Sequence, residues 1–303
     1  MRPIRLKFWG VRGSIPTPGK RTLHYGGNTP CVELNFPGKP LFILDGGSGI
    51  RELGKELLGS PAPVKGYIFL SHFHWDHIQG LPFFKPAFKA NNQFTFFGCD
   101  EPLVQLKDLF SLQMKPYFFP LAIEDMLAKV EFRPIRQTEL EVEGVVVKTI
   151  FLNHPGYALG YRFEFAGKSL VYISDNEPFN DRHVPAIADP EGSASIEDRF
   201  ESFVDNKEAD LIAFLRNCDL LIHDTQFLPE EYQEKKTWGH SPYHYTVDLA
   251  VKSGAKKLVL FHHDPDHDDR TIELILELSR RRLEEKGCNI PCIAAREGET
   301  LEI

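Results

Sequence analysis

Ser71-His72-Phe73-His74-Trp75-Asp76-His77 is the stretch that decides the fold, and from His72 to His77 it reads H-x-H-x-D-H. It follows the apolar run Tyr67-Ile68-Phe69-Leu70, which is typical of a buried strand. Four metal-binding side chains within six positions, just after a strand, indicate a loop that supplies ligands to two metal ions. Imidazole and carboxylate suit zinc, manganese or iron, and the loop offers no thiolate. The alternative interpretation is a polar turn that contains three histidines.

The composition is that of an ordinary globular protein, with 42% hydrophobic and 26% charged residues in 303. No apolar stretch approaches the ~18 residues of a membrane span, and residues 1–9 lack the apolar segment of a signal peptide, so no membrane contact is expected. The five cysteines are scattered and contain no Cys-x-x-Cys pair, which indicates reduced thiols and a cytoplasmic location. The net charge of -8 disfavours a partner held through many phosphates.

Short apolar runs bounded by Gly, Pro or Asn alternate with amphipathic stretches, which indicates a mixed α/β chain. The predicted strands are Arg5–Trp9, Val32–Phe36, Leu41–Leu44, Tyr67–Leu70, Phe94–Phe97, Val145–Leu152, Leu159–Phe165, Leu170–Ile173, Leu220–Ile222 and Lys257–Leu260. The predicted helices are Ile50–Leu58, Leu103–Leu112, Tyr243–Ser253 and Thr271–Glu285. Asp268 or Asp269 is expected to cap the last helix, and Gly254 to end the one before it. We expect a single domain over residues 1–303, with inserted segments near 82–121 and 176–210.

The segment Leu81–Leu121 is crowded with aromatic residues, as in Pro82–Pro86 and Lys115–Pro120. One interpretation is a lid or a base-stacking wall beside the metal loop. The other, which we favour, is hydrophobic core, because phenylalanine is more often buried than exposed.

Three further candidate ligands, His154, Asp175 and His262, each lie two residues after the end of a predicted strand. Loops at one end of a sheet can hold several ligands together, because the scaffold beneath them is rigid. With the first loop, these positions predict a metal site. Either His262 or its neighbour His263 is the ligand, and we favour His262.

At this point the chain resembles the metallo-β-lactamase fold hydrolases over nearly its whole length. The segments that carry the resemblance, besides the metal loop, are Gly10–Pro16, Gly27–Cys31, Leu44–Gly49, His154, Leu159–Phe163 and Val171–Asp175. Within that superfamily it is similar to the phosphodiesterase branch, which contains RNase Z and the anti-Pycsar-type cyclic-nucleotide phosphodiesterases. The resemblance implies an α/β fold, the metallo-β-lactamase αββα sandwich, in which helices flank two mixed sheets.

The resemblance also implies a cofactor of two divalent metal ions, with Zn²⁺ as first choice and Mn²⁺ as the alternative. The family pattern assigns one ion to His72, His74 and His154, and the other to Asp76, His77 and His262. Asp175 stands where the family bridges the two ions, and this arrangement disfavours antibiotic hydrolysis, since many true β-lactamases use a thiolate. Asp45 is similar to an aspartate that supports the ligand loop from behind, and an ordinary turn aspartate is the alternative.

Two further matches separate the phosphodiesterase branch from the others. Asp224 stands where RNase Z carries a glutamate, and His240 stands at the histidine of its His-Ser-Thr motif. Pro242 replaces the threonine, which is a departure from that motif. His244 is a competing candidate, four residues on and on the same side of a predicted helix, and we favour His240.

These residues predict hydrolysis of a phosphodiester. Two metal ions about 3.5–4 Å apart can activate water and clamp a phosphoryl oxygen. We expect Asp76, His240 and Asp224 to be the catalytic residues. In this scheme His240 donates a proton to the leaving oxygen, and Asp224 orients and charge-stabilises its imidazole.

The function that we favour from the sequence is a metal-dependent phosphodiesterase for a small substrate, with a 3′,5′-cyclic nucleotide as first choice. The chain is acidic, has aromatic residues near the loop, and lacks a basic arm between His154 and Asp175, where bacterial RNase Z carries its tRNA-binding insertion. The alternatives are an RNase Z-like endoribonuclease that processes tRNA 3′ ends, and a non-catalytic metal-binding sensor. A homodimer is expected, because family members often form one.

Overall fold

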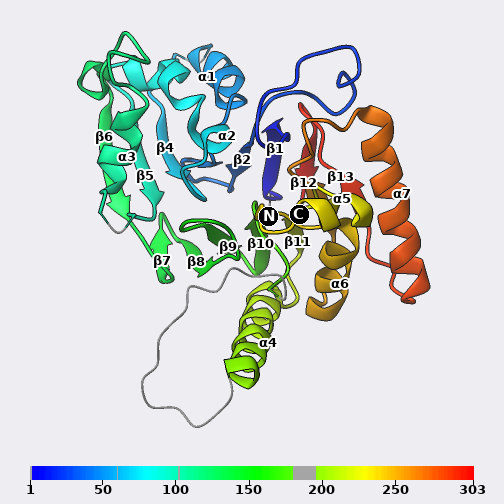
Figure 1. The fold of residues 1–303 in the computed structure, drawn as a ribbon. Helices are drawn as coiled ribbons and strands as arrows, with labels where there is room; N and C mark the ends of the chain where they lie inside the picture. Colours follow the sequence, from blue (N-terminus) through cyan, green and yellow to red (C-terminus); the bar gives the residue numbers. More distant parts are fainter. Residues whose placement is uncertain (1, 60, 102, 180–195) are drawn as a thin grey trace.

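The computed structural model describes residues 2–59, 61–101, 103–179 and 196–303. These residues form two seven-stranded sheets that pack face to face, with helices on both outer faces (Figure 1). The strand order is β14-β1-β2-β3-β4-β5-β6 in the first sheet and β13-β12-β11-β10-β9-β8-β7 in the second. The predicted αββα sandwich of two mixed sheets is therefore confirmed.

The first sheet consists of β1 (Arg5–Gly10), β2 (Cys31–Asn35), β3 (Leu41–Leu44), β4 (Lys65–Phe69), β5 (Gln93–Gly98), β6 (Lys129–Pro134) and β14 (Thr300–Glu302). The second consists of β7 (Glu139–Val142), β8 (Val145–Phe151), β9 (Leu159–Phe165), β10 (Lys168–Ile173), β11 (Leu220–Asp224), β12 (Leu258–Phe261) and β13 (Cys292–Ala294). The α-helices are α1 (Ile50–Leu58), α2 (Trp75–Ile78), α3 (Leu106–Leu112), α4 (Ile196–Leu215), α5 (Pro229–Glu234), α6 (Tyr243–Ser253) and α7 (Asp269–Glu285). The short 3-10 helices are η1 (Leu81–Phe83), η2 (Lys85–Phe88) and η3 (Ile123–Asp125).

The alternation of side chains along each strand explains the layers. In β4, Tyr67 and Phe69 enter the core between the sheets, whereas Ile68 and the following Leu70 enter the core beneath the helices. Across the sheet interface, the ring of Phe69 lies 5.2 Å from the ring of Phe163 on β9. Because β4 is buried on both faces, its sequence is a continuous apolar run rather than an alternating one.

Helices α1 and α3 cover the outer face of the first sheet, and α4, α6 and α7 cover that of the second (Figure 1). Asp268 caps α7 by accepting a 3.0 Å hydrogen bond from the Thr271 amide, and Gly254 ends α6 with a φ of 70°. Both helix ends were predicted correctly. Among the described helices, none combines the length and the apolar character that crossing a membrane requires.

Several elements differ from the prediction. Strands β6 and β7 alternate charged with apolar residues, which is a strand pattern that the sequence analysis missed. Strands β13 and β14 have only three residues each, too few for a recognisable pattern. Helix α3 begins at Leu106 rather than Leu103. The predicted insertion near 82–121 includes β5, which lies between β4 and β6 in the sheet. Of the predicted insertion near 176–210, residues 180–195 lie outside the described residues.

Candidate metal centre

The candidate ligands lie at the carboxyl ends of strands that run in the same direction. β3 and β4 are parallel in the first sheet, and β10, β11 and β12 are parallel in the second. Asp45 follows β3, the metal loop follows β4, His154 follows β8, Asp175 follows β10, Asp224 ends β11 and His262 follows β12. β8 runs antiparallel to β9, and therefore in the direction of β10. The fold thus gathers all these side chains at one end of the sandwich.

The first cluster consists of His72, His74, His154 and Asp175, whose ligand atoms all lie within 4.8 Å of one another. His74 Nδ1 is 2.9 Å from His154 Nε2. Asp175 Oδ2 lies 3.6 Å from His72 Nε2 and 3.8 Å from His154 Nε2. Three imidazoles and one carboxylate therefore converge on one point.

The second cluster consists of Asp76, His77, Asp175 and His262, again within 4.8 Å of one another. His77 Nε2 is 3.2 Å from His262 Nε2 and 3.2 Å from Asp76 Oδ2. Asp175 Oδ1 lies 3.4 Å from His77 Nε2 and 3.3 Å from His262 Nε2. Asp175 thus turns Oδ2 to the first cluster and Oδ1 to the second, which is the arrangement of a bridging carboxylate.

The hydrogen bonds behind the rings determine which nitrogen carries the hydrogen in each neutral imidazole. His154 Nδ1 lies 3.0 Å from the Gly239 carbonyl oxygen, and His262 Nδ1 lies 3.1 Å from the Gln226 amide oxygen. His77 Nδ1 lies 2.9 Å from an Asp45 carboxylate oxygen. These oxygens only accept hydrogen bonds, so each Nδ1 donates and each Nε2 faces the clusters as a lone pair.

The two clusters therefore contain acceptor atoms that face one another. Lone pairs and carboxylate oxygens about 3 Å apart repel unless a cation lies between them. His72 Nε2 is in addition buried without a hydrogen-bond partner among the described residues. Nitrogen and oxygen donors in this number and arrangement fit two divalent metal ions, as the sequence predicts.

The pKa shifts of the histidine side chains agree with this description. Burial lowers the pKa of His72 well below its ordinary value and that of His154 to about 3, so both rings are neutral, as ligands must be. Burial would also lower the pKa of His77, but the carboxylates of Asp76, Asp175 and Asp45 hold it well above the usual range. Three carboxylates around one buried ring thus make this point strongly negative, which favours a cation there.

Asp45 supports the metal loop from behind. Its Oδ1 accepts from the Ser71 amide at 2.7 Å, and its Oδ2 accepts from the Ser71 hydroxyl at 2.9 Å, His77 Nδ1 at 2.9 Å and the Tyr172 hydroxyl at 2.7 Å. Asp45 is fully buried and has a φ of 57°, a backbone conformation that is uncommon outside glycine. A carboxylate with four hydrogen bonds is a positioning group for His77 rather than an ordinary turn residue.

We expect Asp45→Asn to weaken binding of the second metal ion about 10- to 100-fold, the usual cost of losing a hydrogen-bond partner behind a ligand. All four groups around Asp45 are donors, and an asparagine offers one oxygen and one NH₂ group. Whichever way the amide is turned, at least one of the four donors therefore faces the NH₂ group and loses its partner. Titration of the metal-free variant with Zn²⁺ measures the effect. Ser169→Ala, which removes a buried hydroxyl at the opposite end of β10, is the control and keeps the wild-type affinity.

His240 lies beside both clusters, with Asp224 behind it. His240 Nδ1 is 3.3 Å from Asp224 Oδ2 and 3.8 Å from Asp175 Oδ2, and its ring stacks on His262 at 5.0 Å. Burial lowers the pKa of His240, but the neighbouring Asp224 carboxylate outweighs it and raises the pKa to about 9. Asp224 Oδ2 is held by the backbone amides of Ser241, at 3.0 Å, and Asn176, at 3.3 Å.

The two competing histidines lie elsewhere. His263 points away from the clusters and donates from Nε2 to the Ala295 carbonyl at 2.9 Å. His244 belongs to the first turn of α6 and is absent from the metal-capable groups of the described residues. The structure thus brings His262 and His240 to the site and leaves His263 and His244 outside it.

Three supporting contacts were missed by the sequence analysis. Gln226 holds His262, the Gly239 carbonyl holds His154, and the Ser14 amide donates to Asp76 Oδ2 at 2.7 Å. All three residues lie in or beside segments that carry the family resemblance. The sequence could have indicated that these residues lie near the site. It could not indicate which ligand each one contacts, because the two residues of each pair are far apart in the sequence.

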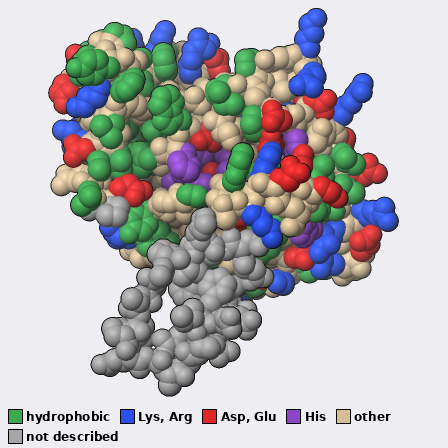
Figure 2. Space-filling view, in the orientation of Figure 1, with side chains coloured by type: hydrophobic (Ala, Val, Ile, Leu, Met, Phe, Trp, Pro, Cys, Tyr) green, Lys and Arg blue, Asp and Glu red, His purple; other side chains and the backbone are tan. Residues whose placement is uncertain are grey.

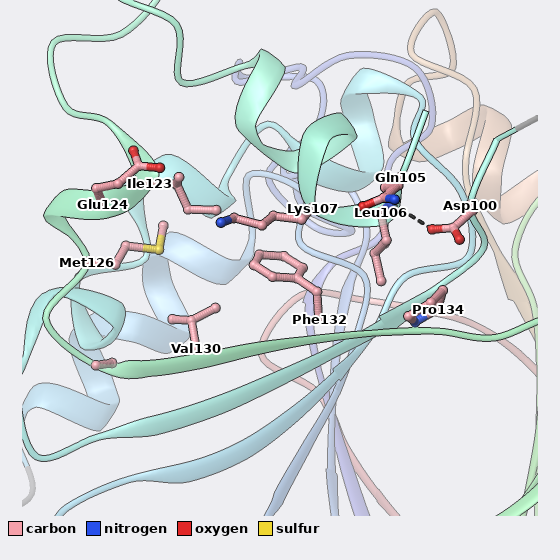
Figure 3. Close-up of a pocket in the computed structure, with 11 residues that line it drawn as sticks. Asp100, Gln105, Leu106, Lys107, Ile123, Glu124, Met126, Val130, Phe132 and Pro134 are labelled. Atoms are coloured by element: carbon pink, nitrogen blue, oxygen red, sulfur yellow. Dashed lines mark hydrogen bonds between the residues drawn. The ribbon is translucent and has the colours of Figure 1, made fainter. Parts of the chain in front are cut away.

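Histidine side chains appear at the centre of one face, with hydrophobic side chains around them (Figure 2). A cavity of about 630 Å³ lies between α3 and β6, lined by Lys107, Glu124, Met126 and Phe132 among others, and no member of the clusters lines it (Figure 3). A second cavity, of about 660 Å³, is lined by Phe73 and Trp75 of the metal loop. Of these two cavities, the second shares residues with the loop.

Comparison with known proteins agrees with the fold. Residues 42–191 match the Beta-lactamase superfamily domain. Ribonuclease Z of Thermoplasma acidophilum is 27% identical over 93% of this chain and 92% of its own length. Ribonuclease Z of Picrophilus torridus is 24% identical over 89% of each chain. The predicted resemblance to metallo-β-lactamase fold hydrolases of the RNase Z branch is confirmed.

Solved structures with the same fold cover almost all of the chain. The metallo-β-lactamase fold protein YhfI from Bacillus subtilis has a TM-score of 0.66 at 17% identity and covers 100% of both chains. A diphosphatase from the PhnP family has a TM-score of 0.63 at 19% identity, covering 99% of this chain and 98% of its own. Human tRNase Z, short form, has a TM-score of 0.62 at 18% identity and covers 98% of both chains.

Proposed function

We propose that this metallo-β-lactamase fold hydrolase cleaves phosphodiesters with two divalent metal ions. The observation that carries the proposal is the pair of four-ligand clusters that share Asp175, with His240 beside both. The ribonuclease Z relatives, which match about nine-tenths of each chain, support the same reaction class.

The chain's own residues have distinct roles in this proposal. When bound, the two ions activate water and polarise the phosphoryl oxygens. His72, His74, His154 and Asp175 hold one ion, and Asp76, His77, His262 and Asp175 hold the other. Histidine and carboxylate donors suit Zn²⁺, with Mn²⁺ as the alternative.

His240 is the proposed proton donor to the leaving oxygen. Its Nδ1 faces Asp224, so Nε2 is the ring nitrogen that remains to reach a substrate. Asp224 positions the imidazole and stabilises its charge, and the two backbone amides on Asp224 keep that carboxylate in place. His240 thus acts on the leaving group, and Asp224 acts through His240.

An RNA 3′ end is the better supported substrate class. The curated relatives are named ribonuclease Z, and human tRNase Z has the same fold. These comparisons favour the endoribonuclease alternative over the cyclic nucleotide that the sequence analysis placed first.

A small diester, including a 3′,5′-cyclic nucleotide, stays as a second candidate because of the β9–β10 hairpin. The two strands are joined by Ala166 and Gly167 alone, with φ angles of 52° and 77° that are typical of a tight hairpin turn. The stretch between His154 and Asp175 therefore has no room for a protruding arm that would grip tRNA. The net charge of -8 also favours a small substrate.

The test presents metal-loaded protein with a precursor tRNA that carries a 3′ trailer, with 3′,5′-cyclic nucleotides, and with methyl 4-nitrophenyl phosphate. Trailer removal, with an affinity that falls steeply as salt rises, supports the endoribonuclease. Conversion of the cyclic nucleotide to a monophosphate supports the small-substrate enzyme. Each activity should disappear on chelation. Failure to cleave all three substrates would contradict the proposal and favour the metal-binding sensor.

Single-domain organisation, a cytoplasmic location and a homodimer remain proposals. The core between the sheets contains residues of both, which supports one domain. Sedimentation of the metal-loaded protein tests the homodimer.

A further inference from the structure

An aromatic pocket of about 660 Å³ lies beside the metal loop, a volume within the usual range for small-molecule sites. It is lined by Phe73, Trp75, Ile78, Gln79, Pro82, Phe83, Leu109, Leu112, Gln113, Tyr117, Phe118 and Phe119. Part of the Leu81–Leu121 segment is core as predicted, since Phe84 and Phe110 are buried. Five of the residues that line the pocket are instead exposed, namely Trp75, Phe83, Leu112, Tyr117 and Phe118.

The pocket and the metal clusters are adjacent because they use the same loop. Phe73 and Trp75 line the pocket, and they alternate in sequence with His72, His74 and Asp76 of the clusters. A substrate whose phosphate lies at the clusters therefore has an apolar surface formed by residues of the same loop.

The rings at the mouth of the pocket are unusually exposed for aromatic side chains. Trp75 is 76% exposed, Tyr117 94%, Phe118 73% and Phe83 53%. A contiguous exposed apolar surface of this kind is characteristic of a binding site. Phe83 is held edge-on against Phe119, at a centroid distance of 5.2 Å, so the wall has a defined shape.

A polar group inside the pocket points to the chemistry of the ligand. Gln113, at the C-terminal end of α3, lines the pocket, and its Nε2 is buried without a hydrogen-bond partner among the described residues. Leaving such a donor unpaired costs stability, so a rotation of the Gln113 side chain that turns Nε2 from its buried position to an acceptor on a ligand is favoured. Aromatic walls with one amide donor match a planar ring that carries hydrogen-bond acceptors.

We propose that this pocket binds a nucleobase of the phosphodiester substrate, stacked on the exposed rings and hydrogen-bonded to Gln113. The proposal rests on the proposed function, because the metal clusters must hold the phosphate of the same substrate. A second copy of this chain covering the exposed rings is the competing occupant. The concave shape, the unpaired amide and the shared loop favour the base.

Calorimetric binding to the metal-loaded protein separates this proposal from the hydrolysis itself. The probes are adenosine 5′-monophosphate and ribose 5-phosphate, which share the phosphate and the sugar and differ in the base. We expect the nucleotide to bind roughly tenfold more tightly, the affinity that stacking of one base typically adds. If the two affinities are equal while the protein still hydrolyses methyl 4-nitrophenyl phosphate, the pocket does not bind a base, and the proposed function is unaffected.

Substitutions in the pocket wall test whether the base binds to these rings. Tyr117→Ala and Phe118→Ala remove rings that are mostly exposed, so they should fold normally while the preference for the nucleotide falls several-fold. Leu274→Ala, on α7, is the control: it truncates a side chain that is 45% exposed and outside the pocket, and should keep the wild-type preference. An unchanged preference in both ring variants would contradict the proposal.

Gln113→Met gives a signature that a purely structural residue would not show. The thioether keeps the length of the side chain and removes the unpaired amide, so the thermal midpoint of the ligand-free protein should rise while nucleotide affinity falls several-fold. A fall in both would assign Gln113 to structure and count against the proposal. A wild-type dimer that Tyr117→Ala dissociates, without any base-dependent affinity, would identify the surface as a self-association interface.

Discussion

Asp175→Asn should weaken binding of both metal ions, remove at least one of them, and lower kcat/KM about a thousandfold or more. Asp175 gives one carboxylate oxygen to each cluster, so the substitution affects both ions at once. An asparagine must turn an NH₂ group, which is a donor, toward one of two clusters that need acceptors. The metal ions stabilise the transition state, and their loss costs several kcal/mol. Because each ~1.4 kcal/mol changes the rate tenfold, about 4 kcal/mol corresponds to a thousandfold loss.

Elemental analysis after dialysis, together with steady-state rates on methyl 4-nitrophenyl phosphate, measures both parts of this expectation. Asp219→Asn is the matched control. Asp219 is also a carboxylate at a strand end of the second sheet, but it pairs with Ser169, Lys168 and Lys256 far from the clusters. The control should keep both ions. A variant at Asp175 that retains two ions and normal turnover would remove the bridging role.

His240→Ala should lower kcat about 10²- to 10⁴-fold on a diester with an alkoxide leaving group, while both metal ions stay bound. The range is the usual contribution of one general acid. His240 is outside the four-ligand groups that contain Asp175, so its removal leaves their ligands in place. It stacks on His262, however, and metal content must be measured alongside the rate.

The leaving group makes this prediction specific. 4-Nitrophenolate is a weak base and departs without a proton, so the variant should be much less impaired on methyl 4-nitrophenyl phosphate than on an alkyl diester. Asp224→Asn should reproduce the same selectivity more weakly, because Asp224 acts through His240. An equal loss on both substrates would assign His240 to structure.

His244→Ala is the matched control for His240→Ala. Both residues are histidines of the same segment, but His244 lies in α6 and outside the metal-capable groups of the described residues. It should leave kcat unchanged on both substrates. A selective loss in this variant would transfer the role of proton donor to His244.

The elements that the sequence predicts well are those with a strong local pattern. β4 is a continuous apolar run because both of its faces are buried, and α7 has an apolar stripe of period 3.6 with Asp268 as its cap. The metal loop follows from the spacing of its own side chains. β13 and β14 are edge strands of only three residues each, and so short a sequence contains no comparable pattern.

The sequence by itself determined which side chains are available for metal and catalysis, because histidine and aspartate after a strand are local features. Only the tertiary structure decided how they are oriented. Asp45 reaches His77 across 32 residues, Gln226 reaches His262 across 36, and Gly239 reaches His154 across 85. These contacts determine which ring nitrogen faces the clusters. The aromatic pocket is likewise formed by the loop with α2, by η1, and by α3 with the segment that follows it. Hydrogen-bond direction and pocket shape depend on partners that only folding brings together.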